Sequence, residues 1–307
     1  MIRSLTSIMF AVLLVHGPIG AAETASDETP PGGDYVGADI CAECHEEKFE
    51  QILPSRHAQM NDLRTPFAIH GCESCHGRGE THALSEGEDL TGLIVFGKRS
   101  AVSPHDQNGQ CLGCHQDTQR MHWQGSAHES ADLVCSSCHL VHQADGVLHK
   151  AKEIDVCLDC HTRVRADIHK ASAHPIRHGQ ITCTDCHSPH GSAGPKALQR
   201  LTLNQQCFAC HAEKRGPFLW EHEPATEDCS TCHYPHGSNN PALLARRAPM
   251  LCQQCHQVLA GSNHASHINE QYSWAGGNTR FLVGASCMNC HSQVHGSNHP
   301  SGATLAR

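Results

Sequence analysis

The chain has 307 residues, including 20 cysteines and 29 histidines, and its formal net charge is −9 at pH 7. Hydrophobic residues make up 38% and aromatic residues 4%, which is too little apolar volume for an ordinary core in a chain of this length. The acidic balance argues against nucleic acid as a partner. We therefore expect bound apolar groups to take the place of a conventional core.

The N-terminus has the pattern of an export signal. Arg3 precedes an apolar run at residues 8–15, and small residues follow at 20–22. The run is shorter than the about 20 apolar residues that span a bilayer, so residues 1–22 predict a cleaved signal peptide, with an uncleaved anchor as the alternative. Residues 23–38 are acidic and rich in Thr, Pro and Gly, and they predict a flexible linker.

Every cysteine belongs to a motif, Cys-x-x-Cys-His, that occurs ten times. The cysteines are Cys41 and Cys44, Cys72 and Cys75, Cys111 and Cys114, Cys135 and Cys138, Cys157 and Cys160, Cys183 and Cys186, Cys207 and Cys210, Cys229 and Cys232, Cys252 and Cys255, and Cys287 and Cys290. The histidines are His45, His76, His115, His139, His161, His187, His211, His233, His256 and His291. This spacing is the attachment signature of haem c, in which two thiols bind the porphyrin and the histidine becomes the proximal iron ligand.

Other uses of the same cysteine spacing fit less well. A zinc ribbon pairs two such knuckles to provide four ligands, and a thioredoxin-like dithiol would occur once. A disulfide framework gives no reason for a histidine after every second cysteine. The ten copies therefore predict a c-type cytochrome with ten covalently bound haems.

The motifs form five units of two, and the units begin at Cys41, Cys111, Cys157, Cys207 and Cys252. The first unit is longer than the others because of an insertion at 77–110, whose apolar residues 93–96 (Leu-Ile-Val-Phe) are expected to pack on a haem, with contact to a partner as the alternative. Repeats of this size predict an elongated multihaem array of short α-helices and irregular loop, with almost no sheet.

A second histidine recurs behind each motif and predicts iron with histidine on both sides. These distal candidates are His57, His128, His174 and His222 behind odd-numbered motifs, and His82, His142, His190, His236 and His295 behind even-numbered ones. In the last unit His264 is favoured slightly over His267. Methionines recur at no repeat position. Iron ligated by two histidines has no open position for a substrate, so the pattern favours electron transfer over catalysis.

Chain length restricts which haem a distal histidine can serve. Three residues extend at most about 10–11 Å, which is too little to pass round the edge of a porphyrin. His142, His190 and His236 lie three residues behind their motif histidines and are therefore predicted to serve neighbouring haems. The histidines behind odd-numbered motifs have enough chain to reach either haem of their own unit, and the sequence does not choose between the two.

Two stretches, GPFLWEHEP continuing to CSTCHYPHGSN at 216–239 and CMNCHSQVHGSNHP at 287–300, resemble the MtrA/DmsE family of decahaem cytochromes. The resemblance covers about 39–302. It implies a haem wire inserted into an outer-membrane β-barrel porin, which passes electrons between a periplasmic carrier and an extracellular partner. That partner would be a multihaem cytochrome or a terminal reductase, in metal or dimethyl sulfoxide respiration or in iron oxidation. The resemblance also implies two pentahaem halves, at 39–170 and 171–300, and a C-terminal tail at 301–307.

Three functions remain open from the sequence. The first is the transmembrane wire of an exported protein, located in the periplasm and associated with the outer membrane through the porin. The second is a soluble periplasmic electron shuttle or store. The third is a multihaem enzyme, which would need a haem with one open axial position, and no motif here departs from the Cys-x-x-Cys-His pattern.

Overall fold

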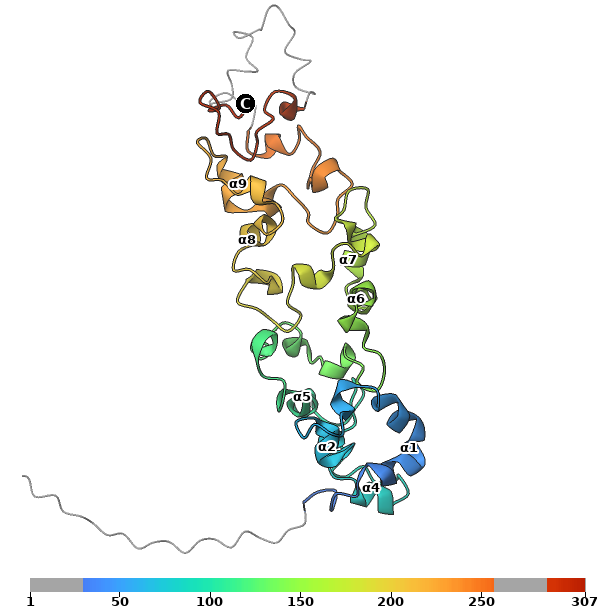
Figure 1. Ribbon diagram of the computed structural model, residues 1–307. Helices are drawn as coiled ribbons and strands as arrows, with labels where there is room; N and C mark the ends of the chain where they lie inside the picture. Colours follow the sequence, from blue (N-terminus) through green and yellow to red (C-terminus); the bar gives the residue numbers. More distant parts are fainter. Residues whose placement is uncertain (1–29, 257–285, 307) are drawn as a thin grey trace, which may run out of the picture.

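The computed structural model describes residues 30–256 and 286–306, and in these residues the chain runs along one long axis (Figure 1). The first helices lie at one end, the middle of the chain follows, and the C-terminal residues lie at the other end. The described residues contain no strand, only four isolated β-bridges, among them Ser172 with Ser238 and His187 with Leu198. The prediction of an elongated array of short helices and loop, with almost no sheet, is confirmed.

The helices are short and do not form layers. They are α1 (Ala38–Ile52), α2 (Pro66–His70), α3 (Glu73–His76), α4 (Glu80–Leu84), α5 (Pro104–Leu112), α6 (Lys150–Leu158), α7 (Thr162–Asp167), α8 (Leu203–Phe208) and α9 (Glu223–Glu227). In the described residues no helix is both long and apolar enough to cross a membrane. Short 3-10 turns connect the helices and begin many of the later motifs.

Little of the polypeptide is buried by its own side chains. Only nine hydrophobic residues of the described part are buried, and they include two small clusters. One cluster holds Ile52, Ala58 and Phe67, and the other holds Leu158, Ile168 and Ile176. This matches the composition, which is too poor in large apolar residues for a single core.

Residues 34–37, within the linker that the sequence predicts to be flexible, form hydrogen bonds to later residues, and the flexibility of the linker stays a prediction. The backbone N–H groups of Val36 and Gly37 donate to the Glu73 carboxylate at 2.9–3.1 Å, and that of Asp34 donates to Glu80 at 2.9 Å. Backbone donors that lie close to a carboxylate form charge-assisted hydrogen bonds, and a polar composition does not prevent this. The predicted signal peptide, 1–22, lies outside the described residues.

The insertion at 77–110 folds back on the second motif. Ile94 donates its N–H to the carbonyl of His76 at 2.7 Å, and the Phe96 ring meets the His76 ring edge-on at 5.3 Å between centroids. The amide of Gln107, which is buried, bonds Gly97 and the carbonyl of Val102. The apolar island therefore packs beside the ring of the second motif.

The predicted boundary between 170 and 171 stays a prediction. Several contacts cross it, including a hydrogen bond from Thr184 to Glu153 at 2.8 Å and an ion pair between Lys150 and Asp185 at 3.2 Å. A backbone pairing at Ser172 and Ser238 lies directly beyond it. The polypeptide on the two sides is thus joined by side chains as well as by the chain itself.

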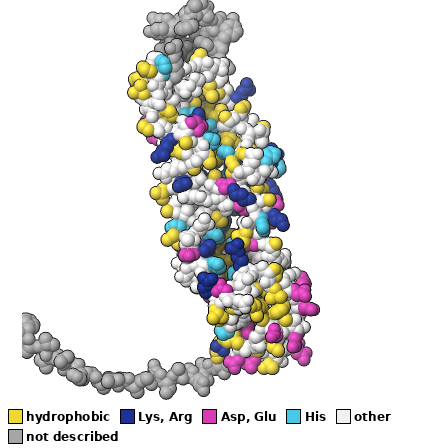
Figure 2. Space-filling view, viewed as in Figure 1, with side chains coloured by type: hydrophobic (Ala, Val, Ile, Leu, Met, Phe, Trp, Pro, Cys, Tyr) yellow, Lys and Arg dark blue, Asp and Glu magenta, His cyan; other side chains and the backbone are white. Residues whose placement is uncertain are grey.

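Charge is distributed unevenly along the axis (Figure 2). Acidic side chains gather at the end that carries α1 and α4, where Glu46, Glu47, Glu50 and Glu88 are exposed. Over residues 34–99, Asp and Glu outnumber Lys and Arg two to one. Residues 286–306, at the opposite end, contain no charged side chain other than histidine. The two ends would therefore present different electrostatic surfaces to partners.

Candidate haem-binding sites

Each motif forms one helical turn. In the nine motifs from Cys72 onward, the backbone N–H of the histidine donates to the carbonyl of the first cysteine at 2.9–3.0 Å. Residues spaced by three and four positions lie on one face of such a turn. The local fold thus directs two thiols and one imidazole to the same side, which is the arrangement that haem attachment requires.

The two motifs of each unit meet at their first cysteines. The pairs in contact are Cys41 with Cys72, Cys111 with Cys135, Cys157 with Cys183, Cys207 with Cys229, and Cys252 with Cys287. The hydrogen bond between the thiols, followed by burial, raises the pKa of Cys41 and Cys207 well above the ordinary value. The same bond lowers the pKa of Cys72 and Cys229 to about 7. The two-motif unit of the sequence is therefore also a unit in space.

A buried polar side chain joins the motifs within each interior unit. Asn108 accepts the N–H of Cys135 at 2.7 Å, and Asn204 accepts the N–H of Cys229 at 2.8 Å. Both asparagines also donate to backbone carbonyls just before the second motif. These two asparagines were not predicted from the sequence. Their common position, three residues before the first cysteine of an odd-numbered motif, is the signal that could have found them.

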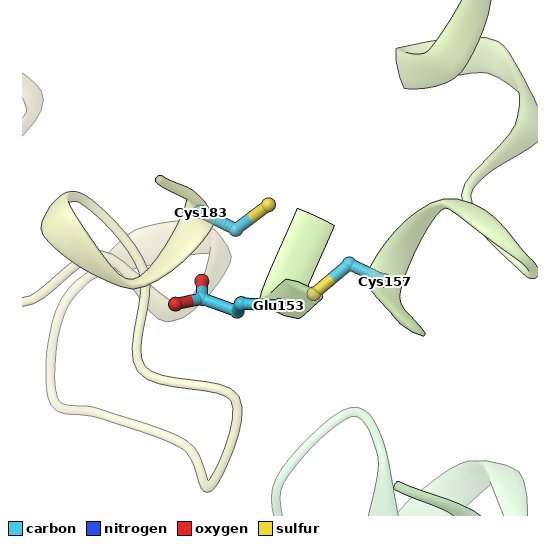
Figure 3. Close-up of side chains that lie close together, drawn as sticks. All are labelled: Glu153, Cys157 and Cys183. Carbon is cyan, nitrogen blue, oxygen red and sulfur yellow. The ribbon is translucent and has the colours of Figure 1, made fainter. Parts of the chain in front are cut away.

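In the middle unit a carboxylate takes this place (Figure 3). Glu153 is 4% exposed and accepts the N–H and the hydroxyl of Thr184, both at 2.8 Å. Its carboxylate lies near the sulfurs of Cys157 and Cys183, and these three side chains could geometrically hold a metal ion. Both sulfurs belong to Cys-x-x-Cys-His motifs, so haem attachment would use them, and the cluster is better explained as a contact between the two motifs.

Successive units meet through the second cysteines. Burial raises the pKa of Cys138, and the nearby Cys160 thiol, in the next unit, raises it further. Burial raises the pKa of Cys232 in the same way, with Cys255 as the next contributor. The nearness of these thiols, together with the course of the described chain along one axis (Figure 1), indicates that the motifs follow one another in space in the order of the sequence.

Nine of the ten motif histidines face a second histidine ring at 6.0–6.3 Å between centroids. The pairs are His45 with His82, His76 with His142, His115 with His57, His139 with His190, His161 with His128, His187 with His236, His211 with His174, His233 with His295, and His256 with His222. The tenth, His291, would pair with a residue of the last unit, and both candidates, His264 and His267, lie outside the described residues.

This spacing fits one iron between each pair of rings. A metal–imidazole bond is about 2.0–2.1 Å and the ring nitrogen lies roughly 1.1 Å from the ring centre, so two rings on opposite sides of one iron place their centroids about 6.2 Å apart. Uncoordinated histidines have no reason to adopt the same separation nine times. The residues present therefore fit haem iron with two imidazole ligands.

The pairs run in two interleaved series. From the fourth motif on, the histidine behind an even-numbered motif faces the previous even-numbered motif, as His236 faces His187, whereas His82 behind the second motif faces His45 of the first. The histidine behind an odd-numbered motif faces the next odd-numbered motif, as His174 faces His211. The expectation that this second group serves its own unit is wrong. In an interior unit both positions are already filled by histidines from the units on either side, and in the first unit they are filled by His82 and His142.

Hydrogen bonds orient the rings. His187 and His233 place Nδ1 against the carbonyls of Lys196 and Ala242 at 3.0 and 2.8 Å. A carbonyl only accepts, so Nδ1 must carry the proton, which leaves the Nε2 lone pair free for a metal. The distal rings of His128, His174 and His222 are held in the same way by the carbonyls of Pro189, Pro235 and Val294. Each of these three carbonyls precedes a distal histidine of the other series, so the two series are bonded together.

Burial also favours the neutral form of several rings. It lowers the pKa of His142, His190, His236 and His295 below the ordinary value, because desolvation penalises the charged imidazolium. A neutral imidazole is the form that ligates iron. The environment of these side chains therefore suits metal coordination before any metal is bound.

Two glycines allow adjacent units to approach closely. Gly191 and Gly237 directly follow His190 and His236. A Cβ at Gly237 would collide with the backbone carbonyl of Asp167, and one at Gly191 would collide with that of His122. The absence of a side chain at these positions lets each distal histidine reach into the preceding unit.

The comparisons with known proteins agree with this geometry. Residues 174–216 and 222–261 match the family described as a doubled CXXCH motif, and residues 72–160 match the NrfB-like cytochrome c-type proteins. The chain is therefore a multihaem c-type cytochrome, an electron-transfer protein that binds haem c covalently through its Cys-x-x-Cys-His motifs.

More particularly, the chain belongs to the MtrA family, as the sequence resemblance indicated. It is 47% identical to the multiheme cytochrome MtrA of Shewanella baltica over 293 residues, which cover 93% of this chain and 86% of that protein. It is also 24% identical to the cytochrome c-type protein NrfB of Escherichia coli over 132 residues, covering 41% of this chain and 66% of NrfB.

Proposed function

We propose that this chain binds ten haems, each with histidine on both sides of its iron, and conducts electrons from one end of the molecule to the other. The observation that supports this most strongly is the set of nine histidine pairs at 6.0–6.3 Å. When bound, haem supplies one-electron exchange at its iron. The polypeptide holds the sites in single file and fills both axial positions, which leaves no place for a substrate.

The wire is proposed to cross the outer membrane inside a porin. The described residues contain no helix long and apolar enough to enter lipid, and most of their backbone is irregular. Irregular backbone is tolerated at membrane depth only where a surrounding protein shields it. The elongated shape suits such a sheath, because five units in line could bridge the about 40–45 Å of a bilayer with its headgroups.

Partners are proposed at both ends. A periplasmic electron carrier would exchange electrons with one end, and an extracellular multihaem cytochrome or a terminal reductase with the other. A carrier with a basic face would suit the acidic end around α1 and α4, and such contacts weaken as salt rises. The wire itself does not set the direction of electron flow.

Haem content and ligation test the first part of the proposal. A pyridine haemochrome assay on the purified protein should return ten haems per chain, and low-temperature EPR should show only low-spin ferric iron. A count of eight or nine would mean that at least one motif is unused. A substantial high-spin signal in the intact protein would instead favour a multihaem enzyme.

Membrane association tests the second part. The cytochrome should co-purify with a porin-sized protein from detergent-solubilised outer membranes, and the two together should carry electrons across a liposome wall. The control is the purified cytochrome alone, added to the same liposomes without the porin, and it should carry no electrons across the liposome wall. Quantitative release as a free monomer by osmotic shock, with no porin partner, would replace this proposal with a soluble periplasmic shuttle.

A further inference from the structure

The motif histidines of the even-numbered motifs are held through Nδ1, and one of them is held differently. His76, His187, His233 and His291 each donate to a backbone carbonyl at 2.6–3.0 Å. His139 instead meets a side-chain carboxylate, Oδ2 of Asp145, at 2.7 Å. In every case the partner comes from the loop that returns after the motif, so Asp145 replaces a neutral acceptor with an anionic one.

The Asp145 carboxylate is well positioned and weakly screened. Its side chain is 14% exposed, and its other oxygen, Oδ1, accepts the N–H of Val147 at 3.2 Å, which caps the 3-10 turn Gly146–Leu148. Among the described residues, its ion-pair partner is His139, and no lysine or arginine pairs with it. The negative charge is therefore directed at the imidazole. Lys98 and Arg120 lie close enough to act on Cys138 and His190 of the same site, but neither forms an ion pair with Asp145.

The opposite ring of the same pair has no such partner. His190 faces His139 at 6.0 Å between centroids, and its Nδ1 is buried without a hydrogen bond to any described residue. The Trp123 ring lies 6.3 Å from the His190 ring between centroids. Hydrogen bonding to the ligands at this site therefore acts from one side, through Asp145.

A carboxylate on Nδ1–H makes the imidazole a stronger electron donor. It draws the proton away from Nδ1 and increases electron density at Nε2, the atom that faces the iron. A more basic ligand stabilises the ferric state over the ferrous state, and hydrogen bonds to the iron ligands are one of the ways in which a protein tunes haem potential. Burial strengthens the effect, because the charge acts through a medium of low dielectric constant.

We propose that Asp145 lowers the reduction potential of the haem attached at Cys135 and Cys138, so that this haem is the lowest in potential among those of the even-numbered motifs. The proposal rests on the histidine ligation in the proposed function. Reduction of this haem adds one electron to ferric iron and gives ferrous iron, while the carboxylate keeps its charge and no proton is required. Asp145 is thus a positioning residue that acts through His139.

The position of this site in the file gives the effect a consequence. The motif of His139 is the fourth of ten, and among the described residues no carboxylate accepts a hydrogen bond from the motif histidines before and after it, His115 and His161. Electron transfer onto a low-potential haem inside the row is energetically unfavourable from either side. Removing the charge should therefore make this transfer less unfavourable in both directions.

The test is a redox titration of the full-length holoprotein that carries Asp145→Asn. Haem reduction is monitored through the absorbance of the haem α-band. Asparagine keeps the shape and an acceptor oxygen but removes the charge. We expect the portion of the titration that belongs to this haem, about one haem in ten, to move to higher potential, with the other nine unchanged. The low-temperature EPR signal of the same haem should shift while staying low-spin.

Asp132→Asn is the matched control. Asp132 lies three residues before Cys135, is exposed, and its side chain makes no hydrogen bond or ion pair among the described residues. Its removal deletes the same charge near the same motif without touching an imidazole, and should leave the titration close to wild type. An Asp145→Asn curve that matches wild type, or that shifts no more than the Asp132→Asn curve, would overturn the proposal.

Asp145→Glu keeps the charge. It serves as the second test if Asp145→Asn does not assemble ten haems. The proposal expects Asp145→Glu to titrate as the wild type does, and a shift of about one haem in ten to higher potential in an Asp145→Glu variant with ten haems would count against the proposal. A wild-type protein with fewer than ten haems, or with high-spin iron, would instead contradict the proposed function. The two failures are therefore distinguishable.

Discussion

The interior units and the first unit form their histidine pairs and loop contacts in different ways. In the interior, contacts repeat at fixed spacing: His128 to Pro189 and His174 to Pro235 both span 61 residues, and His187 to Lys196 and His233 to Ala242 both span 9. In the first unit the spacing is irregular and the unit closes on itself. His82 faces His45 within the unit, and its Nδ1 bonds the carbonyl of Asp89.

This difference shows what a repeating array needs at its end. An interior unit receives one histidine from each neighbour, but the first unit has no preceding neighbour. The insertion at 77–110 and the anchored residues 30–38 provide the missing contacts, in the way that capping repeats close a solenoid. Regular sequence therefore builds the interior, and irregular sequence closes the end.

The largest expected effect comes from removing one distal histidine of each kind. His236→Ala and His82→Ala should each convert about one haem in ten to high spin. His236 also joins two units, because it faces His187 across a unit boundary, whereas His82 faces His45 within one. We therefore expect the larger loss of thermal stability for His236→Ala, measured by Soret-monitored melting with EPR in parallel. Equal melting temperatures for the two variants would show that the interior contact adds nothing.

The next effect concerns the approach of one interior unit to another. Gly237→Ala places a Cβ against the carbonyl of Asp167 and should cost about 1–3 kcal/mol of unfolding free energy through overpacking. Gly109→Ala, within α5, is the control, since a Cβ there meets nothing within 4 Å and alanine favours a helix by up to about 1 kcal/mol. Denaturant unfolding followed by tryptophan emission or the Soret band compares them, and a neutral Gly237→Ala would refute the close approach.

The polar contacts within units give a comparable or smaller effect. Asn204→Ala leaves the N–H of Cys229 without its acceptor and should lower the free energy of unfolding by about 1–3 kcal/mol, through the loss of a contact in the interior of the array. Denaturant unfolding followed through the Soret band measures this loss.

Glu73→Ala instead removes the acceptor of Val36, Gly37 and Gly79 at the end of the array. It should expose residues 30–38 to limited proteolysis, read by mass spectrometry, with the haem count unchanged. Cleavage there in Asn204→Ala as well would mean that the end and the interior are not independent.

The smallest effect is expected at the surface of the middle unit. Lys150→Ala breaks the ion pair with Asp185, in which the lysine side chain is 66% exposed, and should cost only about 0–1 kcal/mol. The loss should shrink further at high salt. A cost as large as that of Asn204→Ala would show that surface charge holds the two motifs of a unit together as strongly as the buried polar contacts do.

The repeating chemistry of this protein is readable from its sequence, because haem attachment requires fixed residues at fixed spacing. The Cys-x-x-Cys-His motifs predict the haem type, the pairing of motifs predicts the two-haem unit, and the poverty of apolar residues predicts the absence of a common core. Chain reach also excludes His142, His190 and His236 from the haems of their own motifs.

Other features depend on contacts between units, which no local pattern encodes. The histidines behind odd-numbered motifs face the next unit and not their own, because the path of the loop decides which site they enter. The anchoring of residues 30–38 depends on Glu73 and Glu80, which reach across from a later part of the chain. Asp145 occupies a position where other motifs use a backbone carbonyl, and a carbonyl leaves no trace in sequence.

The central claim is that each iron lies between histidines contributed by different parts of the file, in the order of the motifs. The most direct test is a crystal structure of the holoprotein with anomalous diffraction data collected at the iron edge. We expect ten iron peaks in single file, with His236 bound to the iron of the haem attached at Cys183 and Cys186. His236 on the iron of its own motif, attached at Cys229 and Cys232, or irons arranged in any other order would contradict the account.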